Sequence, residues 1–377
     1  MSLVVYVVYW SCLLLLIYAF AGYPLAIRCW SWLRPRRICK LQITPTVTVV
    51  MVIHDGADLV RAKLENLLEL DYPADKIDIV VACDGCRDDT AVLCRTFSGL
   101  RIRVMEFAAR RGKAACLNDA AAEAAGELLL MTDVRQQLDP QALRELAANL
   151  ADPTVGAVSG ELRLRDANSG SALGIDAYWR YETLLRQAES RSGSTVGVTG
   201  AIYAMRRSLF QPLPPGTVLG DVLMAMAIAA SGWRVVFEPQ ALTWIRSAQQ
   251  PAEERRRLIR MLAGNYQVVQ LAPWLLQPWR NPLWWRFVSH ELLRLLAPWL
   301  LLLLALCSAA LVTHYRLCAW SLFALLTGLA LLPLARRMPS GVARWLLVRL
   351  AVAFGYLNLF SAQALIAFAR NRRLHLW

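Results

Sequence analysis

The sequence has few of the residues that build metal-binding modules. It contains four histidines in 377 residues, and His54 and His290 have no sequence neighbour at metal-ligand spacing, so we assign neither to a metal. Cys83 and Cys86 form a Cys-x-x-Cys pair, but no second pair follows at zinc-finger or zinc-ribbon spacing. A turn containing small residues explains the pair better, and we predict no zinc site there.

Negatively charged residues are fewer than positively charged ones in this chain, and it has no recognisable nucleic-acid-binding motif. Lys and Arg number 41 against 28 Asp and Glu, which gives a net charge of +13. The basic residues cluster beside apolar runs, where anionic lipid would attract them. Because no zinc-finger, helix-turn-helix or aromatic ribonucleoprotein pattern accompanies the charge, we predict no nucleic-acid partner.

Long apolar runs dominate both ends of the chain. Hydrophobic residues make up 57% of the sequence, which is too apolar for a fully soluble protein. A membrane-spanning helix needs roughly 20 apolar residues, and four runs reach that length: residues 3–20, 292–312, 317–334 and 345–368. The first run lacks a basic n-region and a small-residue cleavage site, so we expect an anchor and not a signal peptide.

The distribution of basic residues orients the chain in a bacterial inner membrane. Five follow the first run, which places the next domain in the cytoplasm: Arg28, Arg34, Arg36, Arg37 and Lys40. Arg336, Arg337 and Arg344 agree with this orientation, whereas Arg370 would lie outside after four spans.

These patterns divide the chain into five parts. We expect an N-terminal transmembrane helix (1–24), a basic linker (25–45), a cytoplasmic catalytic domain (46–245), amphipathic interfacial helices (246–290) and C-terminal transmembrane helices (291–377). Asn358 and Gln363 make the last apolar run the least lipid-like, so we expect it to be broken or to line a cavity.

Strand-like and helix-like segments alternate between residues 46 and 150. The strands are expected at 46–53, 77–82, 101–105 and 128–131, and the helices at 59–70, 91–97, 114–125 and 140–150. This alternation predicts an α/β fold with a mostly parallel sheet and flanking helices. Ligands of such sheets bind at the carboxyl ends of the strands. Because Asp55, Asp84 and Asp133 all follow strands, we expect one shared pocket.

Short motifs follow one another in a fixed order over about 200 residues. They are Lys63 to Leu68 with Asp71-Tyr72-Pro73, Asp84-Gly85, Arg111-Gly112-Lys113, Thr132-Asp133, Thr199-Gly200-Ala201 and Asp221. The stretch 47–244 resembles the catalytic domain of membrane-bound family-2 glycosyltransferases, the inverting enzymes that include cellulose, hyaluronan and poly-N-acetylglucosamine synthases. The resemblance implies a GT-A type, Rossmann-like fold.

The resemblance also implies which residues hold the nucleotide sugar. Asp55 stands in the motif that follows the first strand and would contact the nucleotide sugar. Asp84 would accept a hydrogen bond from the uracil ring. Lys113 would meet the diphosphate as a compact cation. Asp133 would contact the ribose and a Mg²⁺ or Mn²⁺ ion that bridges the two phosphates.

On the acceptor side, the resemblance makes Asp221 the general base. Inverting transfer needs a carboxylate that takes the proton of the acceptor hydroxyl as this oxygen attacks the anomeric carbon. Five further residues are expected at the acceptor end of the pocket: Thr199, Gly200, Ala201, Arg257 and Arg260.

The chain departs from the family pattern at several positions. Asp55-Gly56 replaces an Asn-Glu pair, and Gly220 replaces an acidic residue before Asp221. Arg135 stands where the Asp-x-Asp metal motif has its second acid. An arginine cannot bind a metal ion, but it could pair with the donor phosphates. The Gln-x-x-Arg-Trp signature of polymer synthases ends in Met261, without its tryptophan.

Taken singly, these residues have plainer explanations. Asp84 could shape a turn, Lys113 could be a surface charge, and Asp221 could cap a helix. The joint order of the motifs favours a site instead.

We therefore expect an inverting enzyme that transfers a sugar from a UDP-sugar to a growing polysaccharide. Its partners would be membrane lipid and other subunits of a synthesis and export complex. Two alternatives remain open: transfer of a single sugar to a lipid-linked or saccharide acceptor, and a catalytically silent subunit that keeps only the fold.

Overall fold

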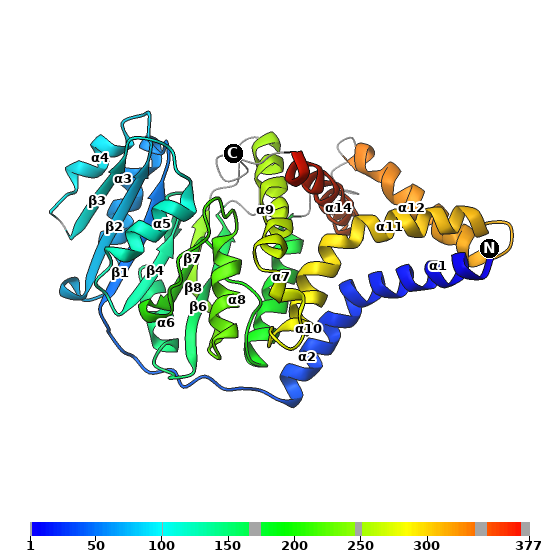
Figure 1. Cartoon of the computed structure of the whole chain (residues 1–377), viewed down its shortest axis with the longest axis horizontal. Coiled ribbons are helices and arrows are strands. Elements are labelled where there is room, and N and C mark those ends of the chain that lie inside the picture. Colours follow the sequence, from blue (N-terminus) through cyan, green and yellow to red (C-terminus); the bar gives the residue numbers. More distant parts are fainter. Residues whose placement is uncertain (1, 100, 166–174, 246–250, 336–344, 371–377) are drawn as a thin grey trace.

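A computed structural model of the chain describes residues 2–99, 101–165, 175–245, 251–335 and 345–370. It consists of a sheet with flanking helices and a helical part that extends to one side (Figure 1). The N-terminus and the turn between helices α11 and α12 lie at the end of the molecule farthest from the sheet.

The described residues form one eight-stranded sheet with the order β3-β2-β1-β4-β7-β6-β8-β5. The strands are β1 Val47–Ile53, β2 Ile77–Asp84, β3 Ile102–Phe107, β4 Leu128–Thr132, β5 Gln136–Leu138, β6 Val155–Leu164, β7 Ile202–Arg206 and β8 Arg234–Ile245. The first four are parallel, as predicted, but β7 runs antiparallel to both β4 and β6, and β5 runs antiparallel to β8. The sheet therefore contains both parallel and antiparallel strand pairs, because β7 and β5 run opposite to the strands beside them.

Both faces of the sheet are covered, which explains why every residue of β1 except the buried Thr48 is apolar. Val49 and Met51 face a core that helices α3 (Ala57–Leu68) and α6 (Ala142–Asn149) close. Val50 faces the other core, formed with α5 (Lys113–Ala122) and α8 (Gly220–Ala230). Successive strand residues point to opposite faces, so a strand between two layers needs apolar residues on both faces.

The remaining elements connect the sheet or build the helical part. They are α1 Ser2–Ile17, η1 Tyr18–Gly22, α2 Tyr23–Leu33, η2 Ala74–Lys76, α4 Thr90–Thr96, α7 Ile175–Arg191, η3 Arg207–Leu209, α9 Pro251–Leu271, η4 Pro273–Leu276, α10 Trp284–Arg286, η5 Phe287–Leu292, α11 Leu293–Leu311, α12 Arg316–Ala335 and α14 Leu346–Arg370.

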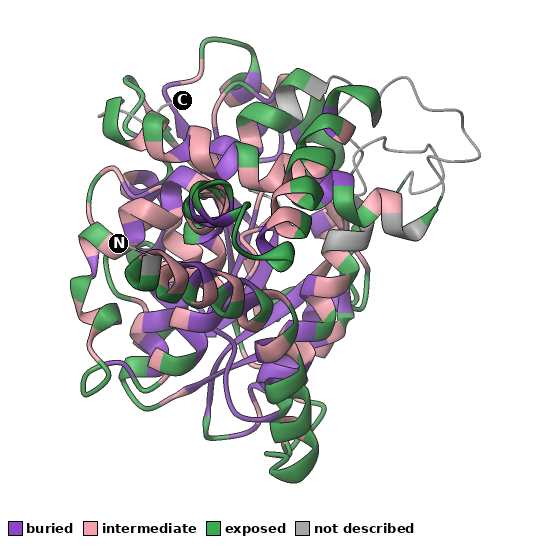
Figure 2. Ribbon diagram, turned by 90° about the vertical axis from the view of Figure 1, so that its right-hand side faces the viewer, coloured by how far each residue is buried: buried purple, intermediate pink, exposed green. Residues whose placement is uncertain are grey.

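Four helical stretches of the described chain are long and apolar enough to span a membrane: Leu3–Leu33, Trp284–Leu311, Arg316–Leu334 and Val348–Arg370. Large apolar side chains stay exposed on them, Trp320 at 68% and Leu306 at 60%, and Figure 2 looks onto this end of the molecule. Exposed apolar surface of this extent suits contact with lipid.

Two boundaries differ from the expectation. The first helix continues to Leu33, so the segment 25–45 begins as a helix. The second span begins at Trp284, inside the segment assigned to interfacial helices. The last run is one unbroken helix, Leu346–Arg370.

Candidate active site

A cavity of about 580 Å³ lies between the carboxyl end of β4 and the helices of the membrane part. It brings together most of the residues predicted from the sequence: Lys113, Asp133, Arg135, Thr199, Gly200, Ala201, Asp221, Arg257 and Arg260. Asp55 and Asp84 are not among its lining residues. The expected single pocket therefore includes Asp133 but not the other two strand-end aspartates.

Asp221 lies in the first turn of α8, with its carboxylate in the cavity. Burial raises the pKa of this carboxyl above its usual value; the charge of Asp133 adds to the rise, and the ammonium of Lys113 opposes it. A general base works best when its pKa approaches the operating pH. The environment of Asp221 therefore suits the role of proton acceptor.

Asp133 follows β4 directly and forms an ion pair with Lys113, the first residue of α5. Burial alone would raise the pKa of the Asp133 carboxyl. The charges of Lys113, Arg135 and Lys63 reverse this effect and hold the pKa below its usual value. Asp133 is thus held as a carboxylate in a surplus of positive charge.

Lys63 is a residue of this site whose role the sequence did not indicate. Its side chain is fully buried in α3, and its ammonium donates to the carbonyl of Gln136 at 2.7 Å and to Oγ1 of Thr132 at 3.0 Å. Thr132 Oγ1 in turn donates to the carbonyl of Ala201 at 2.9 Å. Lys63 therefore holds together the two ends of the loop that carries Asp133, and Thr132 links one of these ends to the predicted acceptor segment.

Asp84 is buried at the end of β2, and its two carboxylate oxygens accept the backbone N–H groups of Arg111 at 2.6 Å and Gly112 at 2.9 Å. Gly112 has a φ of +91°, a conformation that favours glycine, and Lys113 begins the helix after it. Asp84 thus positions the loop that presents Lys113. The predicted contact with the base stays a prediction.

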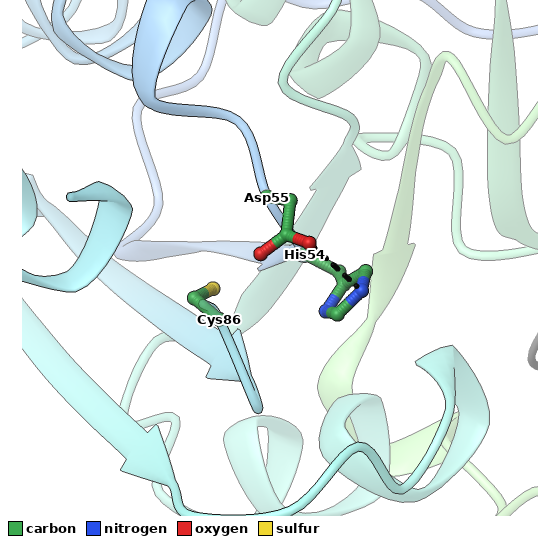
Figure 3. A group of neighbouring side chains, drawn as sticks. All are labelled: His54, Asp55 and Cys86. Atoms are coloured by element: carbon green, nitrogen blue, oxygen red, sulfur yellow. Dashed lines mark ion pairs between the residues drawn. The ribbon is translucent and has the colours of Figure 1, made fainter. Parts of the chain in front are cut away.

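Asp55 lies beside His54 and Cys86 at the carboxyl ends of β1 and β2 (Figure 3). His54 Nδ1 is 2.7 Å from the carbonyl oxygen of Asp84, and its Nε2 is 3.3 Å from Oδ2 of Asp55. Sequence spacing offered His54 no partner for a metal site, but the fold brings Cys86 beside it. Of the residues described, these three form the only group of at least three potential metal ligands.

The other half of the cavity reaches the candidate membrane-spanning helices. Apolar side chains of η1, α11 and α14 line it there: Phe20, Leu295, Leu350, Ala353, Phe354 and Leu357. Ionisable side chains of α7, η5 and α11 line it as well: Glu182, Arg186, His290, Glu291 and Arg294. Asn358 and Ser361 of α14 also line it. The last apolar run therefore lines a cavity, which was one of the two expectations for this run.

A buried charged cluster joins these helices to α7. His290 lies between two carboxylates, with Nε2 2.9 Å from Glu182 and Nδ1 2.9 Å from Glu189. Arg294 donates to Glu182 at 3.0 Å. Burial would raise the pKa of Glu182, but His290 and Arg294 hold it well below its usual value. His290 therefore has two partners that sequence spacing did not reveal, because both are more than a hundred residues away.

The divalent cation expected at Asp133 requires several oxygen ligands. Asp133 supplies one carboxylate, which is already paired with Lys113, and Arg135 occupies the place of the second acid. Asp133 does not belong to the potential metal-ligand group of Figure 3. The side chains around Asp133 therefore offer a metal ion a single carboxylate that is already paired, and do not by themselves form a ligand set for a resident ion.

Comparison with known proteins agrees with the resemblance. The family model described as "Glycosyltransferase like family 2" matches residues 45–264. A probable glycosyltransferase, YdaM of Bacillus subtilis, is 25% identical over 239 residues (60% of this chain and 56% of that protein). A poly-β-1,6-N-acetyl-D-glucosamine synthase of Staphylococcus aureus is 23% identical over 231 residues (59% and 55%). The chain thus spans about half the length of these curated relatives.

One solved structure matches nearly the whole chain. The mannosyltransferase PcManGT of Pyrobaculum calidifontis, solved with GDP-Man and Mn²⁺, is 26% identical with a TM-score of 0.75, over 97% of this chain and 99% of that one. The match confirms the predicted GT-A type fold. Because the family model covers more than half of the chain, this protein belongs to glycosyltransferase family 2.

Proposed function

We propose that this glycosyltransferase transfers a single sugar, with inversion, from a nucleoside diphosphate sugar to a lipid-linked acceptor. The observation that carries the proposal is the continuity of the cavity. It runs from Asp221 and Asp133 to apolar side chains of η1, α11 and α14, all within candidate membrane spans. An acceptor with a hydrocarbon chain can bury that chain among these residues while its sugar reaches Asp221.

The reaction follows from the placement of the charged groups. Asp221 takes the proton of the acceptor hydroxyl as its oxygen forms a bond to the anomeric carbon. The bond from this carbon to the diphosphate breaks, and the nucleoside diphosphate leaves with the bonding electrons. Lys113 lies where it can stabilise the charge that develops on the leaving group. Attack opposite the leaving group inverts the configuration.

The donor is proposed as a nucleoside diphosphate hexose. The sequence predicted a UDP-sugar, while the solved relative that matches nearly the whole chain holds GDP-Man. Both nucleotides therefore belong in the test. We place the catalytic domain on the cytoplasmic face of a bacterial inner membrane, from the basic residues that follow the first span.

Elongation of a polysaccharide is the second candidate, and the likeness to a poly-β-1,6-N-acetyl-D-glucosamine synthase favours it. One feature counts against it. Met261 lines the cavity at the position where polymer synthases have a tryptophan, so the aromatic side chain that the resemblance assigns to the growing sugar chain is absent from this position.

The test measures release of nucleoside diphosphate by the full chain in lipid nanodiscs. UDP-glucose, UDP-N-acetylglucosamine and GDP-mannose are supplied, each with and without a polyprenyl diphosphate-linked monosaccharide. We expect one donor to react, with a rate that rises when the lipid-linked sugar is present. Release that is independent of this acceptor, or absent with every donor, would overturn the proposal.

A further inference from the structure

The charged part of the cavity, which includes both donor-side and acceptor-side residues, has more positive than negative side chains. Lys113, Arg135, Arg257 and Arg260 line it, against the carboxylates of Asp133 and Asp221. Arg260 lies close enough to Arg135 to influence its ionisation: burial, and then the charge of Arg135, lowers the pKa of Arg260, while Asp133 raises it. These side chains thus share one electrostatic environment.

This environment is unfavourable for a divalent cation. A metal ion at Asp133 would have to share the carboxylate with the ammonium of Lys113, which already pairs with its Oδ1. Lys63 lies beneath the loop, bonded to Thr132 and Gln136 on either side of Asp133, and adds positive charge when it is protonated. Because like charges at short range repel strongly in a partly buried site, the site disfavours the ion that the family motif would hold.

The same environment suits a diphosphate. Replacing a carboxylate with a guanidinium raises the local charge by two units, the amount that a divalent cation would supply. A guanidinium also binds phosphate oxygens in a planar, bidentate arrangement. Lysine, arginine and Mg²⁺ are alternative means of stabilising a departing phosphate group.

We propose that Arg135, together with Lys113, takes the place of the metal ion at the donor diphosphate, so that this enzyme transfers sugar without a divalent cation. Lys113 and Arg135 hold the two phosphates and neutralise the charge that remains on the nucleoside diphosphate when the glycosidic bond to it breaks. This inference rests on the proposed function, because it assigns the donor chemistry of the same site.

The first test compares metal dependence in two independent measurements. Turnover of the reactive donor is measured in nanodiscs with EDTA, Mg²⁺ or Mn²⁺. Binding of UDP and GDP to the same protein is measured by calorimetry with and without Mn²⁺. We expect turnover and the dissociation constant to change less than about twofold. Loss of turnover in EDTA with recovery in Mn²⁺, or nucleotide binding that requires Mn²⁺, would overturn the proposal.

The second test restores the second acidic residue of the Asp-x-Asp motif. Arg135→Asp recreates an Asp-x-Asp motif, and we expect it to reduce EDTA-resistant turnover about 10²-fold, the usual effect of removing one such group. Mn²⁺ should recover part of this loss. The matched control is Arg95→Asp, because Arg95 is exposed on α4 and pairs with Glu106; its turnover should stay near that of the wild type. Full activity of Arg135→Asp in EDTA would overturn the proposal.

Failure of this inference and failure of the proposed function give different results. If no donor turns over under any condition, the proposed function fails, while the calorimetric dependence of nucleotide binding on Mn²⁺ still decides the role of the metal. If turnover occurs only with a metal ion, the function stands and the substitution of arginine for metal is wrong.

Discussion

Gly200 lies so close to Asp221 that a β-carbon added to the glycine would be 2.8 Å from Oδ2 of the carboxylate. This approach sets the position of the proposed base against the segment Thr199–Ala201. The resemblance placed Gly200 at the acceptor end of the pocket, and the structure shows that Gly200 also allows the close approach of Asp221.

Substitution of this glycine should therefore move the carboxylate. We expect Gly200→Ala to lower kcat by about 10²-fold, because small displacements of a reacting group have effects of that size, with little change in nucleotide affinity. Steady-state kinetics checks this. Gly197→Ala is the matched control, since its β-carbon would meet Val222 at an ordinary 3.6 Å. Equal effects of the two substitutions would contradict the assigned contact.

Asp221→Asn keeps the shape of the side chain and removes its basicity. We expect kcat to fall by about 10²- to 10⁴-fold, the usual contribution of general base catalysis. Nucleotide affinity should stay unchanged, because the donor contacts come from other residues. Kinetics and calorimetry on one preparation check both statements. A variant that keeps more than a tenth of wild-type turnover would rule out Asp221 as the base.

The environment of Asp221 also predicts the dependence of the rate on pH. Because burial raises its pKa, turnover should decline as the pH falls through a value above the ordinary aspartate pKa of about 3.9. The unprotonated carboxylate is the active form, so the rate is lost on the acid side. A profile of kcat between about pH 4 and 8 measures this, and a flat profile down to pH 4 would contradict it.

Lys63 shows what the sequence could and could not reveal. Its motif marked the family, but its role depends on burial and on bonds to Thr132 and Gln136, about seventy residues along the chain. Strands β1 to β4 and helices α3 to α6 were predicted from apolar periodicity, which is a local signal, whereas the short strand β5 was not predicted. The antiparallel β7, the cluster of His290 with Glu182 and Glu189, and His54 beside Cys86 depend on long-range packing, which periodicity does not encode.

Burial lowers the pKa of Lys63 to about 7, against about 10.4 in an unfolded chain. Between these values the unfolded chain binds more protons than the folded one, so the free energy of unfolding rises with pH. We expect the melting temperature of the wild type to rise from pH 7 to 9 relative to that of Lys63→Met, in thermal melts of both. An identical pH dependence of the two proteins would contradict the assigned burial.

Glu182 should be essential for attaching the membrane helices to the catalytic domain. Glu182→Gln leaves His290, Arg186 and Arg294 without their shared carboxylate. Removing one partner of a buried ion pair costs about 3–5 kcal/mol, so we expect a clear fall in the melting temperature. Glu106→Gln is the control, because its ion pair with Arg95 is exposed and worth less than about 1 kcal/mol. Equal melting temperatures of the two variants would refute this role.

The most direct test of the account follows the transferred sugar itself. Nanodiscs that contain the full chain and a polyprenyl diphosphate-linked monosaccharide are incubated with the reactive donor carrying a radiolabelled sugar. The products are then separated into an organic extract and material retained on a gel. We expect the label in the organic extract as the acceptor extended by one sugar, and no such product from Asp221→Asn. Label found only in gel-retained polymer would contradict the proposal and favour a polysaccharide synthase.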